Sequence, residues 1–255
     1  MATIDYTTDG HVAIITINRP EARNAVNGEV ARGVEEAIDN LEGDDSLWLG
    51  ILTGVPPVFS AGADLKEINA GRAGDLQTKR GGFAGITRRE RSKPIIAAVD
   101  GPALAGGTEI TLACDLIVAS KTAQFGIPEV KRSLVAAGGG LFRLPRKLPF
   151  NIAMELTLTG DPIDAERAHN FGLVNVLCEP GEALAKAKEL AKRVEANAPV
   201  AVRESRKVVY AAMTEDEDSG WSLSAKAMAV AMSSEDMKEG LTAFIEKRPP
   251  NWSGK

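Results

Sequence analysis

The sequence predicts an α/β body followed by a helical tail. Short apolar runs with the composition of buried strands recur at 12–17, 47–52, 95–99 and 116–119. Between them lie segments whose apolar residues recur at three- and four-residue spacing, which is typical of amphipathic helices. From residue 182 onward helical spacing replaces this alternation. A chain of 255 residues has ample length to bury the core of such a fold.

The first elements follow from local signals. The run 12–17 is rich in β-branched residues and is closed by Asn18-Arg19-Pro20. A helix is expected to open between residues 24 and 29, because apolar residues recur on one face as far as Leu41. The strand 47–52 passes through a glycine-containing turn into a helix near Asp64. Residues 68–92 are expected to form a loop and a polar helix.

The segment 94–129 holds the candidate chemistry. Turn residues end the strand 95–99, and a helix is expected to begin near Leu104. The stretch Ala105-Gly106-Gly107 at its start offers uncovered backbone N–H groups to an oxyanion or a polarised carbonyl. Glu109 lies one turn inside this helix, and Glu129 follows the strand 116–119 and a Gly-Ile-Pro stretch. From spacing alone, Glu109 as a surface or capping residue and Glu129 as a loop residue remain open alternatives.

The rest of the chain gives elements without a motif. Three glycines at 138–140 predict a loop of tight backbone geometry before a helix, and they match neither a dinucleotide fingerprint nor a Walker A loop. Residues 161–166 are typical of a capped helix start. The remaining elements are expected to be a helix at 152–158, a strand at 173–177, and helices at about 182–196, 199–213, 219–233 and 236–247.

Composition narrows the function classes. The net charge of −5 gives no reason to expect a nucleic-acid or anionic-membrane partner. The only histidines, His11 and His169, have no metal-ligand spacing and no nucleophile elbow, so neither a metal site nor a Ser-His-Asp triad is expected. Acid–base chemistry must then fall to carboxylates. Cys114 and Cys178 are expected to be buried free thiols, and the absence of a signal-peptide pattern predicts a cytoplasmic protein.

A basic run ends the segment 68–92. Arg88, Arg89 and Arg91 surround a single glutamate. This pattern is typical of a solvated charged face, and a contribution to phosphate binding is the alternative.

Four segments in order resemble the crotonase superfamily, and enoyl-CoA hydratases in particular. They are SAGADLKE at 60–67, AAVDGPALAGGTE at 97–109, AQFGIPE at 123–129 and AFIEKR at 243–248. The resemblance implies a right-handed spiral of ββα repeats with a C-terminal helical region that builds homotrimers or homohexamers. We expect a spiral core with the active site at 1–195 and a helical oligomerisation region at 196–255.

The resemblance also implies roles for individual residues. The backbone N–H groups of Ala63 and Gly106 match the family's oxyanion hole, which polarises the thioester carbonyl of an acyl-CoA. Glu109 and Glu129 match the two catalytic glutamates that manage one water molecule. The residues that match CoA-binding positions are Ala22, Arg23, Ala61, Asp64, Leu65, Lys66, Phe244 and Lys247. For the lysines, an ordinary solvent-exposed position is the alternative.

The activity implied is that of an enoyl-CoA hydratase, a lyase that adds water to a trans-2-enoyl-CoA as in fatty-acid β-oxidation. No metal or redox cofactor is expected, and coenzyme A enters as part of the substrate. An enoyl-CoA isomerase or another enolate chemistry on the same scaffold is one alternative, and a non-catalytic acyl-CoA-binding scaffold is another. The chain departs from many hydratases at 133–137 and at Leu141-Phe142, which leaves the acyl group open.

Overall fold

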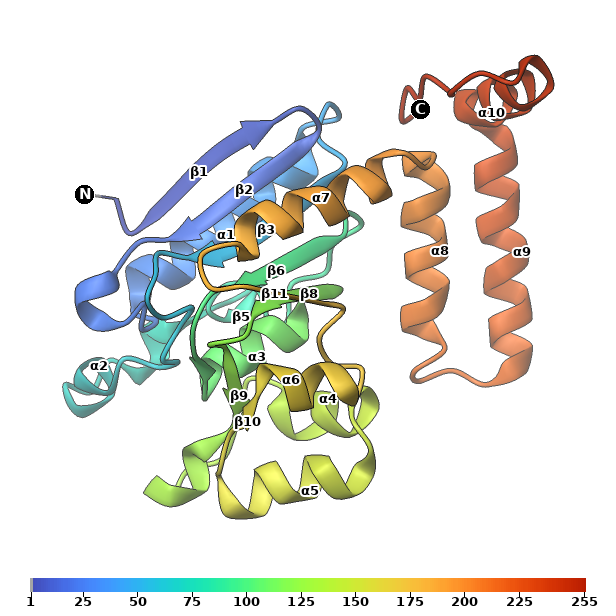
Figure 1. The fold of residues 1–255 in the computed structure, drawn as a ribbon. Helices are drawn as coiled ribbons and strands as arrows, with labels where there is room; N and C mark the ends of the chain where they lie inside the picture. The colour runs from blue at the N-terminus through green and yellow to red at the C-terminus, as the bar shows by residue number, and fades with distance from the viewer. Residues whose placement is uncertain (1) are drawn as a thin grey trace.

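A six-stranded sheet forms the centre of the computed structural model, which describes residues 2–255 (Figure 1). Strand β1 pairs antiparallel with β2, and every other neighbouring pair is parallel. This parallel-dominated sheet with its helices confirms the predicted α/β class. In spatial order the strands are β1 (Ile4–Asp9), β2 (Val12–Ile17), β3 (Leu49–Gly54), β6 (Ile95–Val99), β8 (Leu116–Ser120) and β11 (Val176–Cys178).

A second, narrower row of strands follows the first. It contains β7 (Ala103–Leu104), β9 (Gln124–Gly126) and β10 (Ile163–Asp164), and single bridges join Ser60 to Ala103 and Val26 to Ala63. The turns that begin with β2, β3, β6 and β8 therefore each add a strand to the large sheet, a short extended segment to this row, and then a helical segment. This is the expected spiral of ββα units, and the repeat is structural although the sequence shows none.

Successive side chains of each strand point to opposite faces of the large sheet. Both faces are apolar, and each is covered by a helix. Helix α1 (Gly28–Gly43) packs on one face and α7 (Ala183–Glu195) on the other (Figure 1). In β2, Ala13, Ile15 and Ile17 belong to the core cluster that contains α1. Val12 and Ile14 belong to the cluster that contains α7. An Asn27 side chain that accepts from the Val30 N–H caps the start of α1.

Helix α3 (Gly106–Ala113) lies at the centre of the body. Residues from Gly106 to Leu112 are buried, as expected of a helix with apolar contacts all round. It packs against β7 and against α4 (Gly140–Lys147). The other short helices of the body are α2 (Leu65–Asn69), α5 (Phe150–Thr159) and α6 (Ala165–Asn170).

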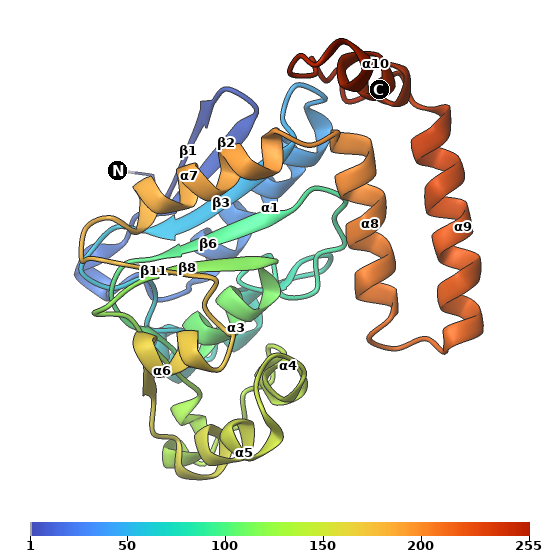
Figure 2. The same cartoon turned by 45° about the vertical axis from the view of Figure 1, so that its right-hand side comes forward.

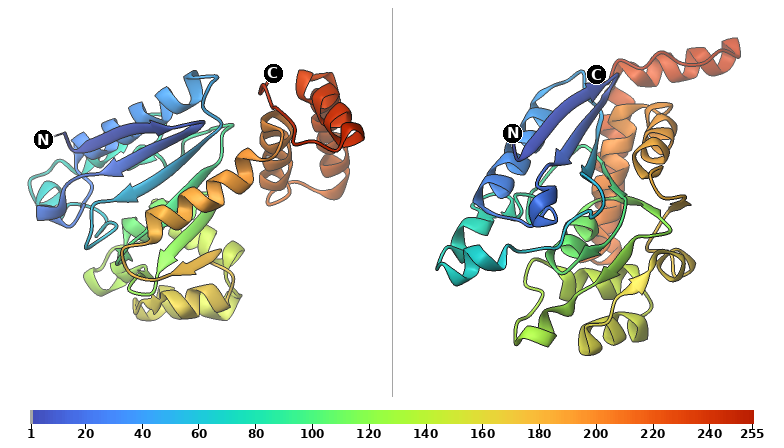
Figure 3. Two further views of the ribbon diagram at one scale, coloured as in Figure 1. Left: turned by 45° about the horizontal axis from the view of Figure 1, so that its top comes forward. Right: turned by 60° about the vertical axis from the view of Figure 1, so that its left-hand side comes forward.

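Three C-terminal helices form an arm that stands away from the body (Figures 2 and 3). Helices α8 (Pro199–Ala211) and α9 (Glu217–Ser233) pair side by side, and α10 (Glu235–Glu246) crosses the end of the pair (Figure 2). Large apolar side chains of the arm are exposed, including Trp221 at 70% and Phe244 at 84%. The proposed division at 195/196 falls directly after α7 and stays a prediction. Among residues 2–255, no helix has the length and apolarity to span a membrane.

Several sequence predictions need correction. Helix α3 begins at Gly106, two residues after the expected start near Leu104, because Leu104 of β7 pairs with Gly126 of β9 (Gln124–Gly126). In place of the polar helix expected within 68–92, the chain has a 3-10 turn (Ala73–Leu76) and a hairpin of β4 (Gln77–Thr78) and β5 (Gly82–Phe83). Gly82 and Gly85, both at positive φ, explain this, because glycine adopts such backbone conformations freely and lowers the stability of a helix. Cys114 and Cys178 are buried free thiols, as predicted.

The basic run at 88–91 is also not the uniform solvated face that its composition predicts. The Arg91 side chain is only 2% exposed and pairs with Asp115 at 2.6 Å. Arg89 pairs with Asp39, whereas Arg88 is exposed and lines the cleft described below. Tertiary contacts, which the local sequence does not contain, decide between these three environments.

Candidate active site

Most of the predicted site residues line one cleft with a volume of about 1570 Å³. Successive turns of the spiral contribute to it at the same place, directly after their short second strand: Ala63 in one turn, Gly106 and Glu109 in the next, and Glu129 in the third. Because repeats stack, residues far apart in sequence meet at one edge. Of the predicted site residues, all line this cleft except Phe244 and Lys247.

The hydrogen bonds of its neighbours limit the direction of the Ala63 backbone N–H. The residues on either side of it pair with Val26, whose N–H donates to the Gly62 carbonyl at 2.8 Å and whose carbonyl accepts from the Asp64 N–H at 2.9 Å. Since backbone groups alternate in direction along an extended segment, the Ala63 N–H points away from Val26. Its place among the cleft residues is consistent with that direction.

Gly106 is the first residue of α3, so its N–H has no acceptor within the helix. Ala105 before it has φ 54° and ψ −126°, a conformation that is strained for a residue with a Cβ. Gly62, at φ 87°, allows the two turns to approach, because a Cβ on it would lie 2.6 Å from the Gly106 nitrogen. The Phe83 ring lies on the other side, 2.4 Å from where a Gly106 Cβ would be.

Glu109 is almost entirely buried, with 4% of the residue exposed. Its Oε1 accepts a hydrogen bond of 2.9 Å from the Gly140 N–H, the first residue of α4. Burial raises the pKa of Glu109, while the backbone groups of Gly140 and Gly138 and the charge of Arg143 act in the opposite direction. The carboxyl lies in the first turn of α3 and at the N-terminus of α4, and both positions favour a negative charge.

Glu129 has a different environment. It lies in the 3-10 turn Pro128–Arg132, and its Oε2 is buried without a hydrogen-bond partner among the described residues. Burial raises the pKa of Glu129 to about 7, and the nearby charge of Glu109 adds to the rise. The two glutamates are therefore close enough to interact, and burial raises the pKa of both.

The candidate CoA-binding residues of the body lie along the same cleft. Ala22 and Arg23 belong to the turn after β2, Ala61 to the turn before α2, and Leu65 and Lys66 to the first turn of α2. Leu65 and Lys66 are exposed and free to contact a ligand.

Asp64 lines the cleft too, but its carboxylate has internal partners. It accepts hydrogen bonds from both Arg19 terminal nitrogens at 3.2 Å and from the Lys66 N–H at 3.0 Å. The side chain therefore joins the two turns and caps α2, and any ligand contact of Asp64 falls to its other atoms.

Phe244 and Lys247 are not brought to the cleft of their own chain. Phe244 lies near the end of α10, and Lys247 follows it as the left-handed C-cap. The arm carries both residues away from the body (Figures 1 and 3).

The sequence predicts no role for several residues that form the cleft. The glycines at 138–140 were predicted only as a tight loop, but they surround the Glu109 carboxyl: a Cβ on Gly138 would lie 2.6 Å from its Oε2. Phe83 and Arg143 also line the cleft and had no predicted role. The glycine run was the one available signal for the loop. Nothing local marks Phe83 or Arg143.

Together these groups can stabilise a developing negative charge and transfer two protons. Two backbone donors at adjacent turns suit a carbonyl oxygen that gains negative charge. Beside them lie two carboxyls: Glu109, whose pKa is raised by burial against hydrogen bonds that favour its charged form, and Glu129, whose pKa is raised to about 7. Such a pair suits a general base and a general acid acting at neighbouring atoms.

Comparison with known proteins places the whole chain in one family. The family model described as enoyl-CoA hydratase/isomerase matches residues 7–255. An enoyl-CoA hydratase of Mycobacterium tuberculosis is 39% identical over 100% of both chains. A short-chain-enoyl-CoA hydratase of Clostridium acetobutylicum is also 39% identical, over 94% of this chain and 93% of its own. A carnitinyl-CoA dehydratase of Salmonella arizonae is 38% identical over 99% and 98%.

Solved structures agree with the sequence relatives. The crystal structure of an enoyl-CoA hydratase from Mycobacterium tuberculosis superposes with a TM-score of 0.96 at 48% identity, with 100% of both chains covered. An enoyl-CoA hydratase from Bacillus anthracis gives a TM-score of 0.91 at 30% identity, covering 99% of this chain and 100% of that one. By sequence and by fold, the chain belongs to the enoyl-CoA hydratase/isomerase family of the crotonase superfamily.

Proposed function

We propose that this protein is an enoyl-CoA hydratase that adds water to a trans-2-enoyl-CoA to give a 3-hydroxyacyl-CoA. The observation that carries the proposal is the placement of Glu109 and Glu129 in one cleft with the backbone donors of Ala63 and Gly106. The names of relatives that cover nearly the whole chain support the same reaction. The proposed chemistry needs no metal or redox cofactor, and coenzyme A enters with the substrate.

The thioester carbonyl is the group that the backbone donors would hold. Attack of an oxygen at C3 of a conjugated thioester moves an electron pair onto the carbonyl oxygen, which gives an enolate. The N–H groups of Ala63 and Gly106 would stabilise this charge, and the N-terminus of α3 adds to the Gly106 contribution. Loss of one such donor typically costs about 10² to 10³ in kcat.

The two glutamates would divide the proton transfers. Glu109, held by the Gly140 N–H, accepts a proton from water as the water oxygen bonds to C3. Glu129, whose pKa is raised to about 7, starts protonated and gives its proton to C2. The net addition is one hydroxyl and one hydrogen. Release of the proton from Glu109 and uptake of one by Glu129 restore the starting state.

The CoA body would lie along the turns at 22–23 and 61–66, with Lys66 near its phosphates. Because Phe244 and Lys247 lie outside their own cleft, they would reach a CoA only in another copy of the chain. This agrees with the proposed homotrimer or homohexamer, in which the exposed apolar side chains of the arm would be covered. Light scattering coupled to size exclusion measures the mass, and a monomer would contradict this part of the proposal.

The test of the reaction is incubation of the purified protein with crotonyl-CoA and longer enoyl-CoAs. Loss of the conjugated-thioester absorbance together with a 3-hydroxyacyl product supports the hydratase. A product with a shifted double bond would identify an isomerase instead. Tight CoA binding with no product would identify a non-catalytic scaffold.

Three glutamine variants sharpen this test. Glu109→Gln and Glu129→Gln should each reduce kcat by about 10² to 10⁴ while CoA affinity is kept. Glu36→Gln is the matched control, because Glu36 is an exposed residue of α1 outside the cleft. Retention of full turnover by either cleft variant would remove that glutamate from the mechanism.

A further inference from the structure

Arg143 connects two walls of the cleft. It lies in the first turns of α4, where its backbone N–H donates to the Gly139 carbonyl at 3.0 Å. Its Nη2 donates to the Thr87 carbonyl at 2.6 Å, and its Nη1 donates to the Gly138 carbonyl at 3.3 Å. Thr87 belongs to the wall after the β4–β5 hairpin, and Gly138 to the glycine loop before α4. One guanidinium thus holds both walls.

The glycine loop has no side chain of its own to fix its shape. It nevertheless touches the Glu109 carboxyl closely, since a Cβ on Gly138 would lie 2.6 Å from Oε2 and one on Gly140 would lie 3.2 Å from Oε1. Glycine has the largest conformational freedom of any residue, so a run of three needs an external contact to stay in one conformation. The Arg143 contact to the Gly138 carbonyl is such a restraint.

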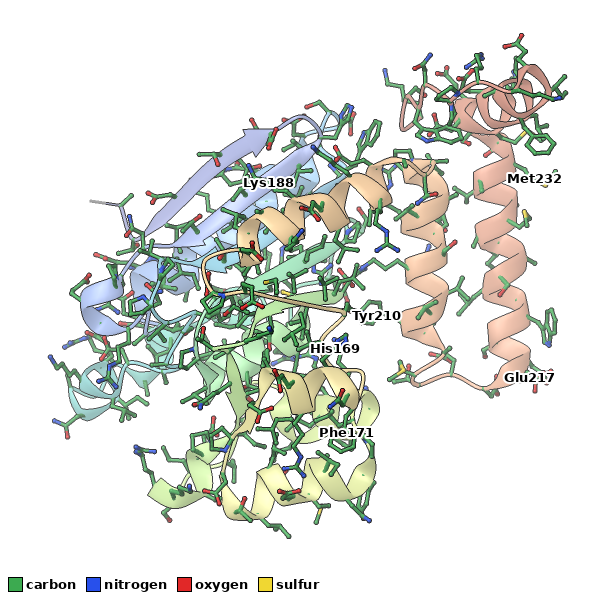
Figure 4. All side chains as sticks on the ribbon, viewed as in Figure 1. His169, Phe171, Lys188, Tyr210, Glu217 and Met232 are labelled. Atoms are coloured by element: carbon green, nitrogen blue, oxygen red, sulfur yellow. The ribbon has the colours of Figure 1, made fainter. Side chains whose placement is uncertain are left out.

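The positive charge of Arg143 is not neutralised by an ion pair. Among the salt bridges of residues 2–255, none includes Arg143. The titratable groups near it are Glu109 of α3, Tyr210 of α8, Arg146 and Lys147 of its own helix, Arg91 of the segment before β6 and the Cys114 thiol. Figure 4 shows Tyr210 on α8. Glu109 is the only acidic side chain in this set.

We propose that Arg143 is a positioning residue for Glu109, which holds the glycine loop in the conformation that presents the Gly140 N–H and keeps the Glu109 carboxyl charged. The inference rests on the proposed hydratase function for its catalytic meaning. The charge of Arg143 does act to lower the pKa of Glu109 against the effect of burial. Arg143 would therefore help one glutamate serve as base while the other serves as acid.

Two variants separate the effect of the Arg143 charge from the effect of its hydrogen bonds to two backbone carbonyls. Arg143→Gln removes both the charge and the forked donor. Arg143→Lys keeps the charge, but a single ammonium does not reproduce the fork that reaches two carbonyls. Arg146→Gln is the matched control, because it removes one positive charge from the same helix at an exposed position.

The first measurement is independent of activity. The carboxyl pKa of Glu109 is read from ¹³C NMR titration of protein labelled in glutamate, with the signal assigned by its loss in Glu109→Gln. Arg143→Gln should raise this pKa by roughly half a unit or more, because an opposite charge nearby stabilises a carboxylate. Arg143→Lys should raise it less, and Arg146→Gln should leave it unchanged.

The second measurement is the pH dependence of kcat and KM with crotonyl-CoA, together with the affinity for unreactive butyryl-CoA. In Arg143→Gln the acidic limb should move to higher pH and kcat should fall by about tenfold or more, while butyryl-CoA affinity is kept. Arg143→Lys should lower kcat with the acidic limb close to its original position.

Two results would overturn the proposal. One is a folded Arg143→Gln protein whose Glu109 pKa and kcat equal those of Arg146→Gln. The other is an equal loss of kcat and butyryl-CoA affinity in both Arg143 variants with no change in the Glu109 pKa, which is the behaviour of a merely structural residue. Failure of the wild type to hydrate any enoyl-CoA would refute the proposed function instead, and the NMR titration would still decide the role of Arg143.

Discussion

The Gly140 N–H donates to Glu109 Oε1 at 2.9 Å, which joins the first residue of α4 to the first turn of α3. This contact fixes a carboxyl that burial would otherwise leave without a partner on that side. It also brings the N-termini of two helices to the same charge, where each favours the ionised form. The conformation of the glycine loop therefore bears directly on the protonation of Glu109.

Gly138→Ala should reduce turnover strongly. The added Cβ would lie 2.6 Å from Glu109 Oε2, so either the carboxyl or the loop must move. A displacement of this size should lower kcat for crotonyl-CoA by about 10². Gly74→Ala is the control, because nothing lies within 4 Å of a Cβ there. Equal steady-state kinetics of the two variants would show that the loop does not set the position of Glu109.

The pH dependence of kcat/KM should be bell-shaped. The proposed acid, Glu129, must carry its proton, and its pKa is raised to about 7, so activity should fall as the pH rises through about 7. The proposed base, Glu109, must be ionised, so activity should rise on the acidic side. Initial rates with subsaturating crotonyl-CoA test this. Activity that keeps increasing well above pH 7 would contradict the assignment of Glu129 as acid.

Glu129→Gln should change stability only on the alkaline side. A carboxyl whose pKa is raised on folding, here from 4.5 to about 7, contributes stability below its unfolded pKa and loses it as the pH rises through the folded value. Glutamine stays neutral throughout. Because Glu129 is only partly buried and solvent screens its charge, the variant should gain on the order of 1 kcal/mol above pH 7 and little below pH 5.

The measurement is the urea midpoint of wild type and variant at several pH values and one protein concentration. Glu36→Gln serves again as the exposed control, with no pH-dependent gain. A variant less stable than wild type at alkaline pH would show that the Glu129 carboxylate has a stabilising partner in solution.

The local sequence predicts those strands and helices whose pattern of apolar residues matches their pattern of burial. The five buried residues of β6 form the apolar run expected at 95–99. Edge strand β1 was not anticipated, because its side chains are largely exposed and polar and give no apolar alternation. The start of α3 lies two residues beyond the predicted one because the pairing of Leu104 with Gly126 is a tertiary contact. Local propensity does not contain such contacts.

The site residues likewise include some that the sequence predicts and some that only the tertiary structure reveals. Glycine turns and glutamates could be located from their motifs, but stacking of the spiral turns is what places Ala63, Gly106 and Glu129 at one edge. Arg143 carried no signal, since its main partner is the backbone carbonyl of Thr87, 56 residues away. A contact to a backbone atom imposes no residue type on its partner, so no pattern of side chains reveals it.

Asp115→Asn should destabilise the protein where the arm meets the body. Asp115 pairs with Arg91 at 2.6 Å and with Arg206 of α8 at 2.8 Å. Burial raises the pKa of Asp115, but these two guanidinium groups outweigh it and the pKa lies below the usual range. Loss of the Asp115 charge leaves the buried Arg91 guanidinium without a counter-charge, which should lower the free energy of unfolding by about 3 kcal/mol or more.

Urea denaturation at fixed protein concentration measures this cost. Asp161→Asn is the matched control, because Asp161 pairs with Lys131 on the surface and both side chains are largely exposed. That change should cost less than about 1 kcal/mol. Equal stability of the two variants would mean that solvent reaches Arg91.

Ala105→Gly tests whether the backbone before Gly106 stores strain. Ala105 has φ 54° and ψ −126°, which a residue with a Cβ adopts at a cost of about 1 to 3 kcal/mol. Glycine adopts this conformation freely, but it adds about 0.4 to 1 kcal/mol of conformational entropy to the unfolded chain. The difference predicts a net gain of about 1 kcal/mol in the free energy of unfolding.

The kinetics of the same variant show whether the strained Ala105 backbone is needed to place the Gly106 N–H. If the Ala105 N–H bond to the Gly126 carbonyl, 2.9 Å long, and the packing of α3 hold the Gly106 N–H in place, kcat should stay within about twofold of wild type. A more stable Ala105→Gly protein with kcat reduced by about tenfold would instead mean that the alanine methyl itself fixes the direction of the Gly106 donor. A less stable protein would show that the methyl contributes packing that exceeds the cost of its backbone conformation.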